Sequence, residues 1–490
     1  MSERPFERVL RLARHEMLPL MVGRVLMGLA AFASVRVLTA VMPPELYGRY
    51  ALVVGYVGFV AALFVNPLAQ AMNRFLHEAA QAGTMRLFLV WGMGSTSLLA
   101  LVGALGVPIF LALYVGSDAS LGLIGLLLVA TLLGANLRDR QLGLFNTFRW
   151  RKRYVALATA DAWAKTLAVA AAVTLWGPSL SSALLGMAAG TWLLALAGLP
   201  WLVELSHHRP ESVAPEAAFE TKTMVRYALP LFGVNALSWL LASSDRYVIA
   251  GVLDEAELGR YVASAQVAMV GPSLLTSAFF PMFTPILYQR MATHPNEPLK
   301  LDRYALAITA LSLFLGGLVV ADLDATFGIL VSRGDYFTGD SVVPFVLLGQ
   351  LAYALHQIAE HEAHFRKRTK GLIVANGLAA FVSLSANFLL APRLGIMGAG
   401  LAAFATYSAL LGATVRIYRP SIAKKTWARI GAMTCATVVA IVALRTVVPQ
   451  EWPLWLRAIA RWGLWTSFAS ALAWVFFRKG LARLRTATSP

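Results

Sequence analysis

The stretch Val37 to Tyr50, VLTAVMPPELYGRY, occurs a second time in this chain as VIAGVLDEAELGRY, Val248 to Tyr261. The two copies lie 211 residues apart, share five identities without a gap, and both end in Gly-Arg-Tyr. The same register extends back to Leu18-Pro19-Leu20 and Leu229-Pro230-Leu231, so that about 33 residues of each half align. Internal duplication in a membrane protein is typical of a transporter whose substrate lies between the halves.

The composition excludes a soluble globular protein. Of the 490 residues 58% are hydrophobic and 14% are charged, and the mean hydropathy is +0.66. A spanning helix needs about 20 apolar residues, and the apolar runs here are continuous rather than alternating, which favours α-helices over a β-barrel. Fourteen such runs are present, at residues 18–41, 50–69, 87–115, 121–147, 155–175, 182–204, 227–251, 261–287, 304–321, 342–364, 371–391, 396–417, 430–448 and 454–477.

The basic residues predict the orientation of these spans. Of the 42 Lys and Arg residues, 31 fall in the tails, the even-numbered loops and their flanks, among them the cluster Arg138 to Arg153; seven fall on the opposite side and four within spans. By the positive-inside rule both termini are cytoplasmic. The net charge of +17 therefore reflects topology rather than nucleic-acid binding. An alternative role for the patch Arg149 to Arg153 is to hold the anionic head group of a lipid substrate.

The ends of the sequence and its single thiol carry little chemistry. The basic segment MSERPFERVLRLARHEM precedes an apolar run too long for a signal peptide, so we expect an uncleaved first span. Cys435 is the only cysteine, which excludes an intramolecular disulfide.

A second correspondence extends the duplication to six helices per half. Pro178 and Leu180 match Pro392 and Leu394 at a spacing of 214. We therefore predict an all-α polytopic membrane protein of about 14 transmembrane helices, with two six-helix lobes of parallel topology around a central cavity and two C-terminal helices. The predicted parts are an N-lobe at residues 1–205, a cytoplasmic linker at 206–223, a C-lobe at 224–420, and the last two helices with a cytoplasmic tail at 421–490.

Several short motifs carry a family resemblance. ELYGRY and ELGRY follow the first and seventh spans, NFLLAPRLGIMGAG occupies Asn387 to Gly400, and Phe327-Gly328 precedes the tenth span. With the six-plus-six plan and two added helices, the chain resembles the polysaccharide (Wzx-type) flippases of the multidrug/oligosaccharidyl-lipid/polysaccharide exporter superfamily. The resemblance implies a bacterial inner-membrane protein that moves an undecaprenyl-diphosphate-linked oligosaccharide of an exopolysaccharide, capsule or O-antigen pathway to the periplasmic leaflet. Its implied partners are that glycan, membrane lipid, and the polymerase and export proteins of such a pathway.

Other functions stay open to different degrees. A multidrug or cation antiporter of the same superfamily needs an acidic cavity, whereas basic residues outnumber acids in these spans; a lipid II flippase differs only in substrate. No Walker loop or hydrolase motif is present, and the longest predicted periplasmic loop, Asp322 to Val343, lacks the paired carboxylates of a glycosyltransferase. We predict no enzyme activity and no cofactor, with H⁺ or Na⁺ as candidate coupling ions.

Ionisable residues within spans are costly in lipid and therefore mark the candidate site. Arg24 has no acid placed to neutralise it in its own span, and the slim face at Gly23 and Gly28 would let a bulky group approach. Its guanidinium is suited to bidentate contact with a diphosphate. The alternatives are that Arg24 extends to the membrane surface or pairs with an acid on another helix.

Arg36 and the repeat-related seventh span supply further cations. Arg36 is a weaker substrate candidate because it lies near the outer end of its span. Asp245 and Arg246 are adjacent, hence about 100° apart around the helix, so at least one should turn towards the cavity. Arg246 is predicted to contact substrate and Asp245 to bind a coupling ion. Arg49 and Arg260, in contrast, are predicted to be loop residues at the outer gate.

The fifth span carries a possible ion pair. Asp161 and Lys165 are four residues apart and share one helix face, so the simplest interpretation is mutual neutralisation. Alternatively the pair opens during transport, which releases Lys165 to the diphosphate or Asp161 to a proton.

The tenth span carries His356, Glu360 and His364 on one face, with His361 and Glu362 beside them. Proton relay through His356 and Glu360 competes with a polar inner end that balances the following basic run. A metal site is disfavoured because no second ligand helix can be named.

Prolines and glycines indicate the parts that bend or pack. Pro67 in the second span, and Pro272, Pro281 and Pro285 in the eighth, are hinge candidates, with static kinks as the alternative. Gly186 and Gly190 form a GxxxG pattern that is predicted to pack a neighbouring helix.

Overall fold

The computed structural model describes residues 5–115, 121–207, 220–293, 301–365 and 370–487, and within these ranges it contains helices and no strand. The all-helical prediction is therefore confirmed. The chain divides into two compact units, Met1–Val262 and Ala263–Pro490. The middle of the predicted linker, residues 208–219, lies outside the described residues.

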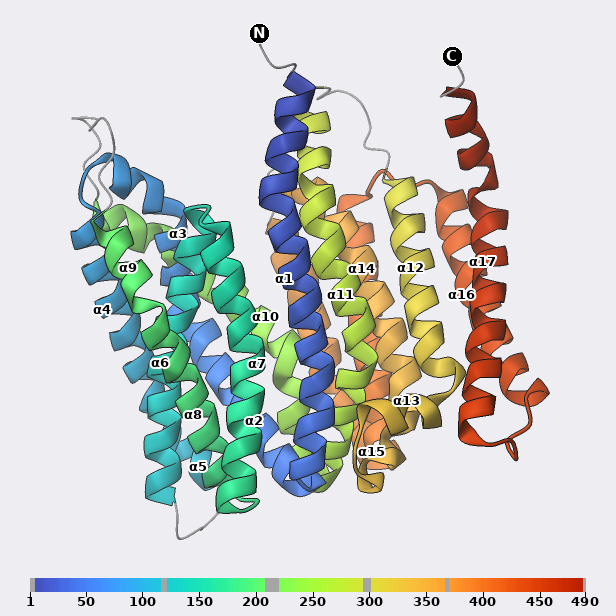
Figure 1. The fold of residues 1–490 in the computed structure, drawn as a ribbon, viewed down its shortest axis with the longest axis horizontal. Helices are drawn as coiled ribbons and strands as arrows, with labels where there is room; N and C mark the ends of the chain where they lie inside the picture. Colours follow the sequence, from blue (N-terminus) through green and yellow to red (C-terminus); the bar gives the residue numbers. More distant parts are fainter. Residues whose placement is uncertain (1–4, 116–120, 208–219, 294–300, 366–369, 488–490) are drawn as a thin grey trace. The chain divides into compact units, whose positions relative to one another are not determined.

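The first unit consists of helices, several of which join end to end into one span. In chain order they are α1 (Pro5–Val41), α2 (Pro44–Val60), the π-helical turn η1 (Ala61–Val65), α3 (Asn66–Gln81), α4 (Met85–Ala104), α5 (Val107–Tyr114), α6 (Leu121–Thr147), α7 (Arg151–Trp176), α8 (Leu180–Ala197), α9 (Leu199–Ser206), α10 (Thr221–Val252) and the first turns of α11 (Glu255–Thr293) (Figure 1). Spans Pro44–Gln81, Met85–Tyr114 and Leu180–Ser206 each combine consecutive helices.

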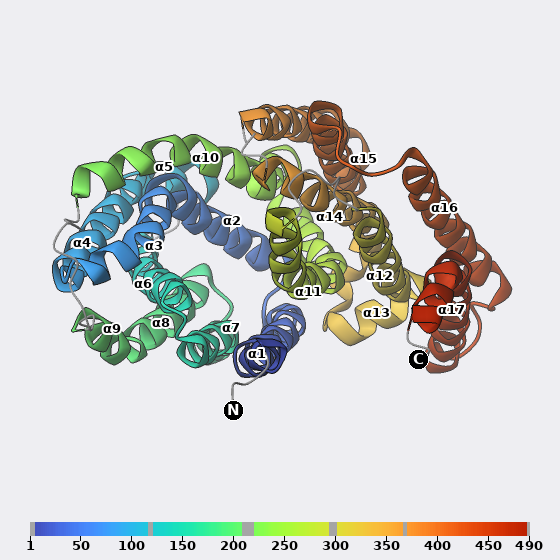
Figure 2. The ribbon, with the colours of Figure 1, turned by 90° about the horizontal axis from the view of Figure 1, so that it is seen from above.

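Helices α1, α6, α7 and α8 pack closely in the first unit, and α10 packs on α3 and η1 (Figure 2). The apolar core is centred on fully buried side chains such as Leu76, Phe88 and Phe145. Gly186 of α8 is pressed against the main chain of α7, where any side-chain carbon would overlap the carbonyl oxygen of Ala168. Small residues let the two backbones approach in this way, which is the geometry that a GxxxG pattern favours in membranes.

The second unit contains the remainder of α11 and the helices that follow it. These are α12 (Asp302–Ala321), α13 (Leu323–Leu330), the 3₁₀ helix η2 (Gly334–Val342), α14 (Val343–Phe365), α15 (Lys370–Tyr418), α16 (Lys424–Val447) and α17 (Leu454–Ala487). Helices α16 and α17 pack on each other and on α12, as both ribbon views show at the red end of the chain (Figures 1 and 2).

Helix α15 is bent at Gly395, whose φ of 61° and ψ of −147° are not helical. Only glycine enters this backbone region without steric cost. The bend lies between the two predicted runs 371–391 and 396–417, so that each run corresponds to one of the two helical parts of α15.

Every predicted apolar run falls on a helix. Eleven helical segments in the described ranges are long and apolar enough to cross a membrane, and α15 is one of them. The runs 261–287 and 454–477 fall on α11 and α17.

Two predicted loops are helical instead. Arg49 and Arg260 lie in the first turns of α2 and α11, not in loops, because Pro44 starts α2 at its first position and the Asp254 carboxylate accepts from the Glu257 N–H at 2.7 Å. The stretch Asp322 to Val343 is likewise largely helical, since Asp322 caps α13 by accepting from the Ala325 N–H at 3.1 Å.

Candidate functional site

Arg24 lies in α1, five residues or roughly 8 Å inside the span that begins at Pro19. Its side chain is partly buried, and no acid among the described residues pairs with it. Gly23, however, packs against Val155 of α7, so a side-chain carbon there would come within 2.6 Å of a valine methyl group. The slim face at Gly23 therefore serves helix packing and does not admit a ligand, which corrects that part of the prediction.

Arg36 lies in the last two turns of α1 and is exposed. Long basic side chains near the end of a span reach the interface easily. Both arginines lie five residues from an end of the span Pro19–Val41, but Arg36 is exposed whereas Arg24 is partly buried.

Asp161 of α7 is the centre of a buried charge cluster. Lys165 Nζ lies 2.8 Å from Asp161 Oδ2, and Arg138 Nη1 of α6 lies 2.9 Å from Asp161 Oδ1. Arg138 also contacts Asp139 at 2.6 Å. Asp161 and Arg138 are each only 8% exposed, so this pair is largely removed from solvent, whereas the Lys165 side chain is 31% exposed. Removing one partner from such a cluster is expected to be costly.

Two arginines of α6, which the sequence count included with the helix flanks of the cluster Arg138 to Arg153, are buried in the structure. Arg138 lies nine residues, or about 14 Å, before the end of α6 at Thr147. Arg140 is 7% exposed, donates from Nη2 to Asn66 Oδ1 at 3.3 Å, and its Nε has no partner among the described residues. A buried arginine with only a neutral partner is a functional-site signal that hydropathy counting missed.

Arg140 contacts the second span at its irregular point. Asn66 follows the π-helical turn η1 and precedes Pro67, which occupies the first turn of α3. A π-helical turn widens the backbone and is frequent at functional sites. Pro67 therefore lies beside a bend-prone segment, and its role as a hinge stays a prediction.

Asp245 and Arg246 of α10 are directed at different neighbours. Asp245 accepts from the Tyr261 hydroxyl at 2.6 Å and from the Arg246 backbone N–H at 2.9 Å. Arg246 Nη1 lies 3.5 Å from the Ala51 carbonyl oxygen of α2, and the two side chains form no ion pair with each other. Arg246 thus lies against a backbone carbonyl rather than a carboxylate.

Two neighbours of Arg246 make the same kind of contact with α2. Tyr247 Oη donates to the Leu52 carbonyl at 3.1 Å, and Trp239 Nε1 donates to the Gly55 carbonyl at 3.1 Å. A helical carbonyl retains a second lone pair for such a bond. A polar seam therefore joins α10 and α2 along the candidate cation Arg246.

On α14, His356 is buried, and each of its two ring nitrogens contacts a different neighbour. Its Nδ1 lies 2.9 Å from Thr414 Oγ1 of α15, and its Nε2 lies 3.2 Å from Glu360 Oε2. The predicted pair is thus a local contact, and within the described residues no group of three His, Cys, Asp or Glu side chains is arranged to hold a metal. The side chains of Glu362 and His364 lie outside the described set.

The hinge candidates of the eighth span all fall in α11. That helix runs without interruption from Glu255 to Thr293, and Pro272 is buried within it. The side chains of Pro281 and Pro285 lie outside the described residues.

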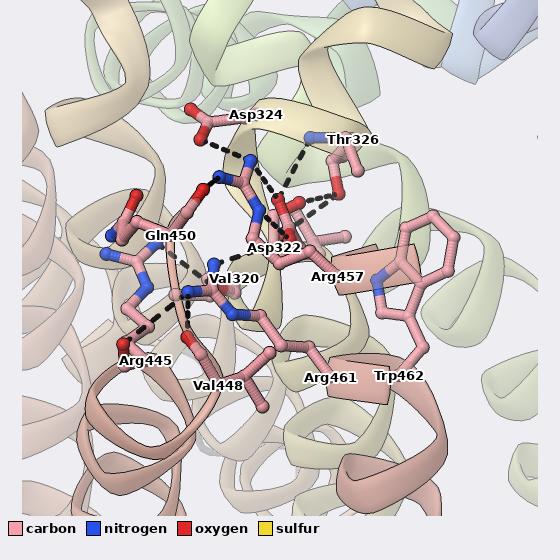
Figure 3. Close-up of polar contacts among 12 residues, drawn as sticks. Val320, Asp322, Asp324, Thr326, Arg445, Val448, Gln450, Arg457, Arg461 and Trp462 are labelled. Carbon is pink, nitrogen blue, oxygen red and sulfur yellow. Dashed lines mark hydrogen bonds and ion pairs between the residues drawn. The ribbon is translucent and has the colours of Figure 1, made fainter. Parts of the chain in front are cut away.

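The second unit contains a charge network that the sequence prediction did not include. Asp322, whose side chain is fully buried, lies 3.0 Å from Arg457 Nε and 3.3 Å from Arg461 Nη1 of α17 (Figure 3). Arg457 also reaches Asp324 at 2.7 Å, and Arg445 of α16 donates to the Val320 carbonyl at 3.0 Å. The network joins α12, α13, α16 and α17 at one end. The sequence does contain one indication of this network: Arg457 and Arg461 are four residues apart, which places both on one face of a helix.

Apolar grooves flank this network. One of about 220 Å³ is lined by α12, α14 and α16, with Arg445 as its charged lining residue; another of about 170 Å³ lies between α12, α16 and α17. Both grooves belong to the second unit and neither contains a predicted site residue.

The fold is that of known membrane transporters. The structure of the lipid II flippase MurJ in an inward closed conformation is similar with a TM-score of 0.69 and 10% identity, and the alignment covers 95% of this chain and 99% of that one. An inward-facing multidrug resistance MATE family transporter of the MOP superfamily gives 0.60 and 13%, covering 85% and 97%. A MOP superfamily transporter from Pyrococcus furiosus with a binding pocket of reverse polarity gives 0.52 and 10%, covering 86% and 95%. No curated protein sequence matches the chain.

The fold and the apolar helices define the class: a multi-pass membrane protein with the fold of known membrane transporters. Residues 15–287, more than half of the chain, match the family described as Polysaccharide biosynthesis protein. The chain belongs to that family.

Proposed function

We propose that this protein is a flippase that moves an undecaprenyl-diphosphate-linked oligosaccharide from the cytoplasmic to the periplasmic leaflet of the bacterial inner membrane by alternating access. Membership of a polysaccharide biosynthesis family supports a glycan as cargo. The similarity of fold to a lipid II flippase is consistent with a lipid-linked one.

One observation carries the choice of an anionic cargo: three buried or half-buried arginines well inside the spans of the first unit lack an acidic partner among the described residues. They are Arg24, Arg140 and Arg246. Buried or half-buried guanidinium groups need a counter-charge, which a diphosphate supplies with matching bidentate geometry. An extruder of cationic drugs would instead need buried acidic side chains that lack basic partners.

Arg24 and Arg246 are the proposed diphosphate or acidic-sugar contacts. Lys165 would also contact the diphosphate if its ion pair with Asp161 opens. Arg36 would contact the substrate at the outer end of the span. Asp161, Asp245, Glu360 and His356 are the proposed coupling positions for H⁺ or Na⁺. The remaining proposed partners are the polymerase and export proteins of the same pathway.

The function is tested by deleting the gene and identifying the lipid-linked oligosaccharides on the cytoplasmic face. We expect one undecaprenyl-diphosphate-linked glycan to accumulate and a plasmid copy to remove it. If no glycan accumulates and sensitivity to cationic drugs rises instead, the protein is an extruder and the proposal is wrong.

The site is tested with Arg24→Ala in the complemented deletion strain. A charged hydrogen bond contributes about 1.5–3 kcal/mol, so we expect export to fall at least about tenfold with protein level and membrane insertion unchanged. Arg74→Ala is the matched control, because Arg74 forms an exposed pair with Glu78 at 2.7 Å. Unimpaired export by the Arg24 variant would remove this residue from the site.

A further inference from the structure

The two Gly-Arg-Tyr copies meet each other in space. Gly48 of α2 lies against the main chain of α11, where a side-chain carbon would overlap the Glu255 carbonyl oxygen. Gly259 of α11 lies against α2 in the same way, and a carbon there would overlap the Pro44 carbonyl oxygen. Both contacts belong to the first unit, which extends to Val262.

These contacts are related by the sequence duplication. At the repeat spacing of 211, Gly48 corresponds to Gly259 and Pro44 corresponds to Glu255. Each glycine therefore touches the repeat mate of the residue four positions before itself. Such reciprocity is expected only if the symmetry axis that relates the two repeats passes between the glycines. The shared motif is thus explained by a self-complementary contact, which requires glycine in both copies at once.

Beside these glycines, a partly exposed ion pair joins the two helices. Arg49 Nε lies 2.9 Å from Glu255 Oε2 across the two helices, and Arg49 Nη2 lies 2.9 Å from Glu45 Oε1 on its own helix. Arg49 and Glu255 are about one-third exposed, and partly exposed ion pairs contribute little to stability. Arg49 also has an alternative acid, Glu45, if α11 withdraws.

We propose that Gly48 and Gly259 form the closed outer gate of the transporter, and that this contact separates and re-forms in each transport cycle. The inference rests on the proposed alternating-access function. A contact on the axis between two parallel repeats at one membrane face is the point that closes that face when the repeats rock together. Arg49 acts as a reversible latch that releases Glu255 and keeps its bond to Glu45 when the gate opens.

A cross-link tests whether the contact must open. In a Cys435→Ser background, Arg49→Cys with Glu255→Cys joins α2 to α11, whereas Arg74→Cys with Glu78→Cys joins two positions of α3. We expect oxidation to reduce glycan export by the first pair at least tenfold relative to the same variant before oxidation, reduction to restore that starting level, and oxidation to leave export by the control pair unchanged. Full export by the oxidised α2–α11 pair would show a permanent pivot and would overturn the proposal.

A second measurement does not depend on the identity of the cargo. Spin labels on the same two cysteines, in lipid nanodiscs, should report a short and a long distance by double electron–electron resonance. Gly48→Ala should shift the population several-fold towards the long distance, and Gly58→Ala should not, because a carbon at Gly58 meets its neighbour Trp239 at an ordinary 3.7 Å. A single short distance that Gly48→Ala leaves unchanged refutes the gate, whereas failure of the glycan assay alone refutes only the proposed cargo.

Discussion

Charged side chains removed from water show how single residues shape this protein. Asp161 neutralises Arg138 and Lys165 in the first unit, and Asp322 neutralises Arg457 and Arg461 in the second. In both cases one carboxylate serves two cations. Loss of either carboxylate would remove two ion pairs at once from a partly or fully buried cluster, so these aspartates are expected to matter more for stability than any of their partners.

Asp322→Asn is expected to reduce the free energy of unfolding by about 3–5 kcal/mol, because it leaves Arg457 and Arg461 facing a neutral amide. The apparent midpoint of thermal unfolding of the detergent-purified protein, followed by tryptophan fluorescence, measures the effect. Asp324→Asn is the control in the same network. Its side chain is 59% exposed, so a change within about 1 kcal/mol is expected. Equal losses from the two variants would contradict this account.

Sequence could identify some of these charges but not their partners. Asp161 and Lys165 were readable because a spacing of four on one helix is a local property. Arg138 is 23 residues from Asp161 and on another helix, and Arg457 is 135 residues from Asp322. Hydropathy places such arginines at the ends of spans, whereas only tertiary packing shows that they are buried.

Glycine determines how closely whole helices approach. Gly186 brings α8 against the main chain of α7, and Gly317 of α12 brings that helix against the Trp465 ring of α17. An added side chain would be harder to accommodate at Gly186 than at Gly317, because Gly186 faces backbone atoms of α7 whereas Gly317 faces a side-chain ring.

Gly186→Ala is therefore expected to force α7 and α8 apart and to reduce the free energy of unfolding by about 1–3 kcal/mol. The matched control is Gly94→Ala on α4, where an added carbon meets nothing within 4 Å. That change is expected to be neutral or slightly stabilising, since alanine is the better helix former. Thermal unfolding measured as above separates the two, and an unaffected Gly186 variant would refute the packing argument.

Irregular elements were the least predictable part of the fold. Pro67 marked an irregular point of the second span, but the π-helical turn Ala61–Val65 before it has no sequence signature. Likewise Asp322 to Val343 was polar enough to be predicted as a loop. In the structure it forms a capped α-helix, α13, and a short 3₁₀ helix, η2. Long apolar runs predict helices reliably because lipid leaves the backbone no alternative, and that constraint weakens at the ends of spans.

At the scale of the whole molecule, the predicted orientation can be tested on α16, whose two ends carry exposed residues. In a Cys435→Ser background, we expect a membrane-impermeant maleimide to label Glu451→Cys in intact cells. Lys425→Cys should be labelled only after permeabilisation, because the positive-inside rule places the basic end of α16 in the cytoplasm. Labelling of both positions in permeabilised cells is the control for reactivity. The reverse pattern would invert the proposed direction of transport.

The duplication was visible in sequence because both copies are needed at one contact. Identical Gly-Arg-Tyr endings survive where two helices touch reciprocally, whereas Arg24, Asp245 and Arg246 have no counterpart in the other half. The repeat gives no information about residues that differ between the halves. Which neighbours they contact could be learned only from the structure.

The Asp322 network also has a consequence for biosynthesis. Asp322 is translated 135 residues before Arg457, which lies in the last helix of the chain. At about 5–20 residues per second, its carboxylate waits on the order of ten seconds for a guanidinium partner. The second unit therefore acquires its final ion pairing only when α17 enters the membrane. A nascent chain that stalls after α16 therefore presents, at the end of α12, a carboxylate that lacks both of its guanidinium partners.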